Sequence, residues 1–158
     1  MDDDETRFLE IAYEEADGSP LTTVSSQALA RKLGTDEDRQ RRMERDLMDR
    51  GLLEDAGSGY RLRIPAIHSV EEQRLEEGRD EVVDERRQQR GDYVRELYDL
   101  AEEDPTVAVP LSDLKEQLTM AADVEKRTRE YLVAAGLLVV EDDRVQLTEQ
   151  GAEWVAAA

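Results

Sequence analysis

Cysteine is absent from the 158 residues of this chain, and lysine occurs only three times. The lack of cysteine excludes disulfide bonds and thiolate metal sites. No apolar run approaches the roughly 20 residues that a membrane-spanning helix needs. The acidic start MDDDETR does not fit a signal peptide. These absences predict a cytoplasmic protein with no membrane partner and no bound metal.

Charge of one sign dominates what is present. The sequence has 40 Asp and Glu residues against 21 Lys and Arg, a formal net charge of −19 at pH 7. High acidity with scarce lysine resembles the proteins of halophilic archaea that hold multimolar salt in the cell. The alternative is an acidic protein of a mesophile. At such salt the Debye length is about 3 Å or less, so the net charge does not argue against binding to nucleic acid.

An internal repeat organises the chain. When the sequence is shifted by 85 residues without gaps, residues 13–62 match residues 98–147 at thirteen positions, most of them apolar or turn residues. Two domains of about 70 residues would each have a small core. We predict domain 1 at residues 1–68, a charged helical linker at 69–91 and domain 2 at 92–158.

Each copy predicts the same series of elements. A first helix at about 5–16, and again at 92–103, has apolar residues at helical spacing and precedes a loop that contains a proline. A short second helix follows, for which Ser26 and Ser112 are the expected N-caps. A third helix ends before a glycine, and two short strands then form a hairpin. The predicted fold is mainly α with small β-hairpin wings.

Helix, helix, turn, helix and two-stranded wing is the plan of the winged helix-turn-helix. The stretch LARKLGTDEDRQRRMERDLMDRGLL resembles the second and third helices of that family, and GLLVVEDDRVQLTEQGAEWV resembles its wing and the start of a closing helix. The resemblance implies two such domains in tandem, as in haloarchaeal winged-helix transcription regulators. Copy one departs from the pattern, because it has RIPAIHS where copy two has LTEQG. It therefore either lacks the closing helix or replaces it with the linker.

Basic side chains gather in one stretch of domain 1. Residues 31–63 hold nine basic and eight acidic side chains, a net charge of +1, which leaves −20 for the remainder of the chain. This stretch covers the predicted second helix, third helix and wing. Because nucleic-acid binding depends on where charge lies rather than on its total, the stretch is the expected DNA-binding surface.

The third helix of copy one sets which arginines face outward. Its inward stripe runs from Gln40 through Met43 to Leu47. The arginines that then point outward together are Arg41, Arg42 and Arg45. Arginine suits contacts to guanine and to phosphate. On the second wing strand, two more arginines share one face. The predicted DNA-contacting residues are Arg39, Arg41, Arg42, Arg45, Tyr60, Arg61 and Arg63.

An alternative is that these arginines only form salt bridges on the helix surface. Asp38 with Arg42, and Arg45 with Asp49, are pairs four residues apart, each worth a few tenths of a kcal/mol. Copy two lacks the basic face, and its hairpin turn EDDR carries three carboxylates. We expect copy two to pack, to dimerise or to bind a protein partner. Its outward positions, which sum to zero charge, are Asp123, Lys126, Arg127, Glu130 and Ala134.

The linker allows two interpretations. Its Glu and Arg residues at three- and four-residue spacing predict an exposed helix, either a solvated spacer or one face of a homodimer. In the second case Leu75, Val82 and Val83 would contact the partner copy.

The sequence offers little for catalysis. His68 is the only histidine, and no Gly-rich phosphate loop, zinc pattern or nucleophile motif is present. We expect no enzyme activity and no cofactor. The expected function is a homodimeric transcription regulator that binds double-stranded DNA. The alternative is a tandem winged-helix protein-interaction module, of the chromosome-segregation or complex-scaffold type, without specific DNA binding.

Overall fold

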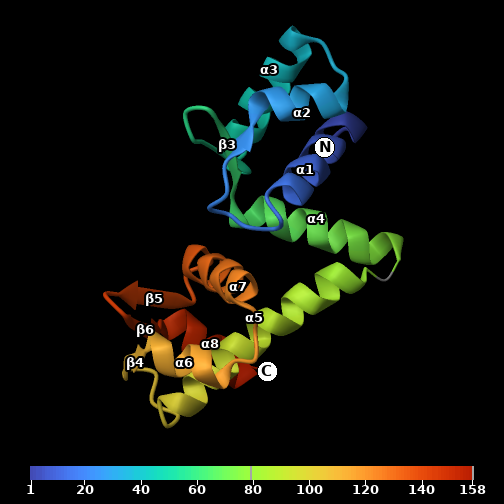
Figure 1. Ribbon diagram of the computed structural model, residues 1–158. Helices are drawn as coiled ribbons and strands as arrows, with labels where there is room; N and C mark the ends of the chain where they lie inside the picture. The colour runs from blue at the N-terminus through green and yellow to red at the C-terminus, as the bar shows by residue number, and fades with distance from the viewer. Residues whose placement is uncertain (79, 158) are drawn as a thin grey trace. The chain divides into compact units, whose positions relative to one another are not determined.

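The computed structural model describes residues 1–78 and 80–157. It divides the chain into two compact units, residues 1–80 and residues 81–158 (Figure 1). Each unit has its own sheet and its own buried side chains, and each is described by itself below. Within the described residues, no helix combines the length and the apolar character that crossing a membrane requires.

The first unit has four helices and a three-stranded antiparallel sheet in its described part. Strand β3 lies in the middle of the sheet, with Leu53 opposite Leu62 on one side and Ser25 opposite Gly59 on the other. Gly59 is required there, because a Cβ atom would lie 2.0 Å from the carbonyl oxygen of Val24. The elements are α1 (Asp3–Glu15), β1 (Val24–Ser25), α2 (Ser26–Leu33), α3 (Glu37–Asp49), β2 (Leu53–Asp55), β3 (Gly59–Leu62) and α4 (Ile64–Glu77).

The second unit repeats this order. Its middle strand is β6, which pairs antiparallel with β4 and β5, and its core gathers around Tyr93, Leu97 and Leu114. The elements are α5 (Glu81–Leu100), β4 (Val109–Pro110), α6 (Leu111–Gln117), α7 (Ala122–Ala134), β5 (Leu138–Glu141), β6 (Arg144–Leu147) and α8 (Glu149–Ala157).

The offset of 85 residues relates the two units element by element. It carries the bounds of α3 onto those of α7, and those of β3 onto those of β6, without any shift. Leu47 and Leu132, which it also relates, are both buried. The predicted mainly helical fold with small antiparallel hairpins is confirmed. The sequence did not predict the strands β1 and β4, because two residues are too short to show an alternating pattern.

The predicted cap of the second helix is wrong in both copies. Ser25, not Ser26, caps α2, and its hydroxyl oxygen accepts a hydrogen bond from the backbone N–H of Ala28 at 3.4 Å. In the second unit Pro110 precedes α6 and makes no side-chain cap, and Ser112 lies inside the helix. Ser26 does not cap the helix, and its hydroxyl instead donates a hydrogen bond to the buried carboxylate of Glu44 at 2.8 Å.

Helix α4 takes the place of the closing helix in the first unit. Pro65 lies in its first turn, where a proline is tolerated because the N–H it lacks would have no partner in the helix. The described residues of the predicted linker, 69–78 and 80–91, form no separate element, because most of them complete α4 or begin α5. The buried residues of α4 include a carboxylate, that of Glu71. Its Oε2 accepts a hydrogen bond from the hydroxyl of Tyr13 at 2.8 Å.

Candidate nucleic-acid interface

Helix α3 presents the basic face of the first unit. Its N-terminus is capped by Asp36, whose Oδ1 accepts from the backbone N–H of Arg39 at 2.8 Å. Its C-terminus ends at Gly51, which has φ +75° and donates to the carbonyl of Met48. The predicted inward stripe is found: Gln40, Met43 and Leu47 are all buried.

A buried carboxylate joins α3 to α2 and to the wing. Glu44 accepts hydrogen bonds from the hydroxyl of Ser26 at 2.8 Å, the hydroxyl of Tyr60 at 2.7 Å and the side-chain amide of Gln40 at 3.0 Å. Three donors satisfy a carboxylate that would otherwise be costly to bury. Sequence reasoning missed Glu44 because glutamate is rarely buried. Its position four residues after Gln40 was the available signal.

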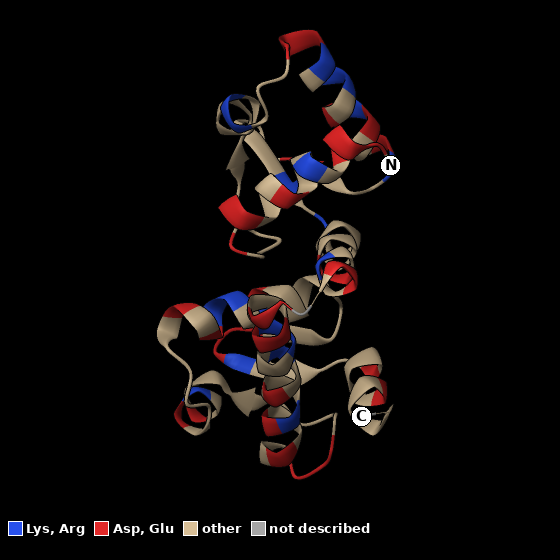
Figure 2. Ribbon diagram, turned by 90° about the vertical axis from the view of Figure 1, so that its right-hand side faces the viewer, with Lys and Arg blue, Asp and Glu red and all other residues tan. Residues whose placement is uncertain are grey.

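Three arginines of this region are paired within the unit. Arg39 donates to Asp4 of α1, with Nε and Oδ2 2.9 Å apart, and the hydrogen bond raises the pKa of Arg39. Arg50 pairs with Glu5 of α1 and with Asp46, and Arg41 pairs with Glu37. Arg39 and Arg50 therefore fasten α1 against α3, so their guanidinium groups are already engaged. Figure 2 shows how blue and red segments alternate along these helices.

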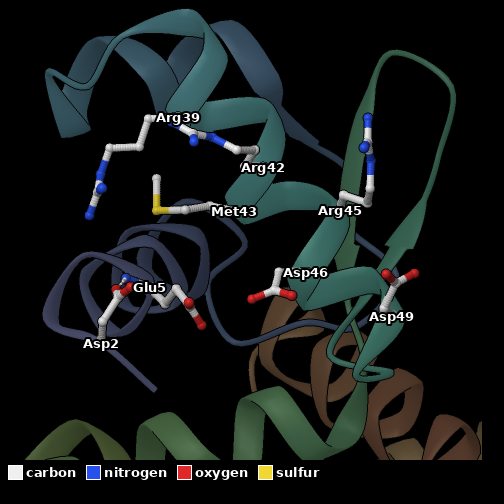
Figure 3. Close-up of a pocket in the computed structure, with 8 residues that line it drawn as sticks. All are labelled: Asp2, Glu5, Arg39, Arg42, Met43, Arg45, Asp46 and Asp49. Carbon is white, nitrogen blue, oxygen red and sulfur yellow. Dashed lines mark hydrogen bonds between the residues drawn. The ribbon is translucent and has the colours of Figure 1, made fainter.

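Arg42 and Arg45 differ from the other arginines of α3. Both are exposed, and within the described part of the chain neither has an ion-pair or hydrogen-bond partner. The pairs Asp38–Arg42 and Arg45–Asp49 that the sequence suggested do not form. In Figure 3 the guanidinium of Arg45 points away from Asp49. Two guanidinium groups of one helix are thus open to a ligand.

A shallow hollow of about 460 Å³ lies beside these two arginines (Figure 3). Its lining combines three guanidinium groups with four carboxylates, so it does not suit an anion inside it. The carboxylates on the α1 side would repel a phosphate backbone, which leaves the outer face of α3 as the side that an anion would approach. The lining residues are Asp2, Glu5, Arg39, Arg42, Met43, Arg45, Asp46 and Asp49.

The two arginines of the wing differ in their exposure. Arg61 is half-buried, lies opposite Glu54 and donates weakly to the hydroxyl of Thr23 at 3.4 Å. Arg63 follows the strand with extended backbone and is exposed, so it shares a face with Arg61. The hydroxyl of Tyr60, which the sequence placed among the DNA-contacting residues, donates to Glu44 inside the unit.

Tyr60→Phe is expected to lower the free energy of unfolding by about 1–2 kcal/mol near neutral pH, because it removes one hydrogen-bond donor from the buried carboxylate of Glu44. Burial and Glu44 raise the pKa of Tyr60 well above its ordinary value of 10.0. The stability that Tyr60 contributes is therefore complete below pH 10.0 and declines above it, as the unfolded chain ionises. The difference between wild type and variant in urea unfolding should shrink as the pH rises beyond about 10. A difference that grows with pH would contradict the assignment.

The remaining predicted residues lie outside this surface. Leu75 is half-buried, Val82 is 48% exposed and Val83 is fully buried, so only Val82 offers a large area to a partner copy. His68 is exposed on α4, and its Nε2 lies 3.8 Å from a carboxylate oxygen of Glu72.

The third helix of the second unit, α7, carries a different buried carboxylate. The buried carboxylate of Glu125 accepts hydrogen bonds from the hydroxyl of Tyr93 at 2.7 Å and from Arg129 at 3.2 Å. The offset of 85 relates Glu125 to Gln40, and Arg129 to Glu44. The same two helix positions therefore carry different polar pairs, Gln40 with Glu44 in the first unit and Glu125 with Arg129 in the second. At the tip of the second hairpin, the three carboxylates are exposed as predicted: Glu141, Asp142 and Asp143.

Comparisons with known proteins add little to this geometry. No protein-family model matches the sequence, and no curated protein matches it. Among solved structures, the mRNA-binding domain of elongation factor SelB from E. coli, in complex with SECIS RNA, is similar over 94% of this chain and 100% of that chain. The sequence identity is 13% and the TM-score is 0.38, so the function must be argued from this chain's own residues.

Proposed function

We propose that each unit is a winged helix-turn-helix domain and that the chain is a transcription regulator that reads double-stranded DNA through its first unit. The observation that carries this proposal is the unpaired state of Arg42 and Arg45. Carboxylates outnumber cations about two to one in this chain, 40 against 21. Arg42 and Arg45 lie three residues apart on one helix, and in the described part of the chain neither guanidinium has a carboxylate partner, so both are available to an anionic ligand.

The arginines would divide the work of recognition. In a winged helix-turn-helix the third helix enters the major groove, where Arg42 and Arg45 would each donate two hydrogen bonds to guanine. Arg41 and Arg63 would contact phosphates, which position the domain without reading sequence. Arg39 would act indirectly by holding α1 against α3. High salt weakens phosphate contacts through counterion release, so base contacts would supply most of the affinity in a halophile.

Selection from a random double-stranded DNA library at multimolar KCl tests the proposal directly. We expect enrichment of one short motif, because base contacts persist when phosphate contacts are screened. A palindromic motif with half-sites about one helical turn apart would support the proposed homodimer. Failure to enrich any sequence, both at multimolar KCl and in dilute buffer, would contradict the proposal.

A second candidate function is a protein-interaction module without specific DNA binding. The exposed carboxylates at the tip of the second hairpin favour it, because a wing that contacts DNA would need cations there. In that case affinity purification from cells should recover a protein partner, and the DNA selection should give no motif. We expect no enzyme activity under either proposal.

A further inference from the structure

The second unit contains a hollow between its first helix and the two helices that follow. The hollow measures about 550 Å³ and lies where α5 passes the end of α6 and the start of α7. Leu118, Met120 and Val124 give it an apolar part. Its charged lining consists of three carboxylates and one guanidinium, those of Glu85, Asp92, Glu96 and Arg95. All of these residues belong to the second unit, and none lies near the arginines of α3 in the sequence.

Two arginines occupy the matching place in the first unit. The guanidinium of Arg39 bonds to Asp4, with Nε and Oδ2 2.9 Å apart. The guanidinium of Arg7 donates to the backbone carbonyl of Lys32 at the end of α2, at 3.3 Å. Cationic groups at a helix C-terminus stabilise its partial negative charge. The first unit therefore places two guanidinium groups of its own between the first helix and the helix-turn-helix.

The second unit has lost both of these cations. The offset of 85 residues replaces Arg39 with Val124 and Arg7 with Asp92. It also replaces Asp4 with Gln89, and all three replacements line the hollow. The Oε1 atom of Gln89 is buried and has no hydrogen-bond donor among the described residues. The place that holds Arg7 and Arg39 in the first unit is thus lined in the second by three carboxylates and by a single guanidinium, that of Arg95.

We propose that this hollow binds an arginine side chain supplied by a partner protein. The aliphatic stem would cover Leu118, Met120 and Val124, as arginine stems commonly cover apolar surface. The guanidinium would pair with Asp92 and Glu96. Asp92 is free to do so because its present partner, Arg95, is an exposed neighbour at 3.4 Å. Rotation about the last torsion of Gln89, which is a soft torsion, would bring its oxygen to a guanidinium N–H.

The inference does not rest on DNA binding by the first unit. It gives a specific form to the interaction role of the second unit, and it would hold whether or not Arg42 and Arg45 contact DNA. The two are therefore tested separately.

The first test is an NMR titration of the full chain with Nα-acetyl-arginine amide. We expect saturable shifts in the millimolar range at the side-chain amide of Gln89 and the methyl groups of Met120 and Val124. The matched ligand is the citrulline analogue, which keeps the shape and loses the charge. It should bind about tenfold more weakly, because charge-assisted hydrogen bonds are lost. Equal binding of the two ligands, or no saturable shift with the arginine probe, would overturn the proposal.

The second test fills the hollow from within. The double variant Gln89→Asp with Val124→Arg rebuilds the pair that Arg39 forms with Asp4, so it should fold and should lose binding of the arginine probe. Ala134→Arg adds the same cation to an exposed position at the end of α7 and should bind as the wild type does. Wild-type affinity in the filled variant would overturn the site.

A third variant removes one carboxylate of the hollow without a change of size. Asp92 is exposed, so Asp92→Asn should keep the fold and should weaken binding of the arginine probe about tenfold. Sedimentation of the wild type and the filled variant identifies the source of the arginine. If the wild type self-associates and the filled variant does not, the occupant is a second copy of this chain, and the assignment to a partner protein is wrong.

Discussion

Replacing Arg42 and Arg45 together with alanine is expected to abolish sequence-specific DNA binding. A guanidinium that donates two hydrogen bonds to guanine contributes about 1–3 kcal/mol of discrimination, so losing two should reduce specific affinity by roughly 10²–10⁴-fold. The free energy of unfolding should change by only about 0.5 kcal/mol, because both side chains are exposed and unpaired within the described residues. Fluorescence anisotropy with the selected duplex and urea unfolding measure the two quantities.

The control for this variant removes two cations elsewhere. Lys126→Ala with Arg144→Ala changes the net charge by the same amount, and both residues are exposed in the second unit. Loss of general electrostatic attraction would weaken both double variants alike, whereas base contacts from α3 predict a large loss only for the first. Wild-type specificity after removal of Arg42 and Arg45 would refute the assignment of α3 as the reading helix.

Leu47→Ala and Leu132→Ala are expected to have the largest effects on stability. The offset of 85 relates these leucines, which lie on the third helix of their units. Both side chains are buried, with 0% and 1% exposure. Each truncation should cost about 2–5 kcal/mol, through lost burial and the cavity left behind. Since a whole domain is stable by about 5–15 kcal/mol, either change should strongly destabilise its own unit.

Hydrogen exchange read by mass spectrometry separates the two units. Leu47→Ala should raise exchange mainly in α1, α2 and α3, and Leu132→Ala mainly in α5, α6 and α7. Leu21→Ala is the matched control, because Leu21 is 49% exposed and its truncation leaves no cavity. If Leu47→Ala raised exchange equally in both units, the two cores could not be stabilised separately.

Local pattern was enough to predict most of the helices and both hairpins. The inward stripe of α3 was read correctly because burial along a helix follows a period of 3.6 residues, which neighbouring residues alone reveal. The repeat was visible for a related reason. Two units with the same core need apolar side chains at the same positions, so Leu47 and Leu132 recur at a constant offset.

Pairing between distant residues could not be predicted in this way. Spacing along α3 suggested that Arg42 would pair with Asp38 and Arg45 with Asp49, yet both arginines lack partners among the described residues. Arg39, in contrast, pairs with Asp4, which lies 35 residues away. Such an ion pair depends on how α1 packs against α3, and no local pattern contains that information.

The sequence by itself therefore determined the repeat, the helices and the outward face of α3, because these follow from the periodic placement of apolar residues. Only the tertiary structure decided which guanidinium groups remain available. It brought Ser26 and Tyr60 to the buried carboxylate of Glu44. It also left a hollow lined by three carboxylates and one guanidinium in the unit that lacks the counterparts of Arg7 and Arg39. The physical reason is that polar contacts are selected by distance and angle in space, whereas apolar burial is already encoded by spacing along the chain.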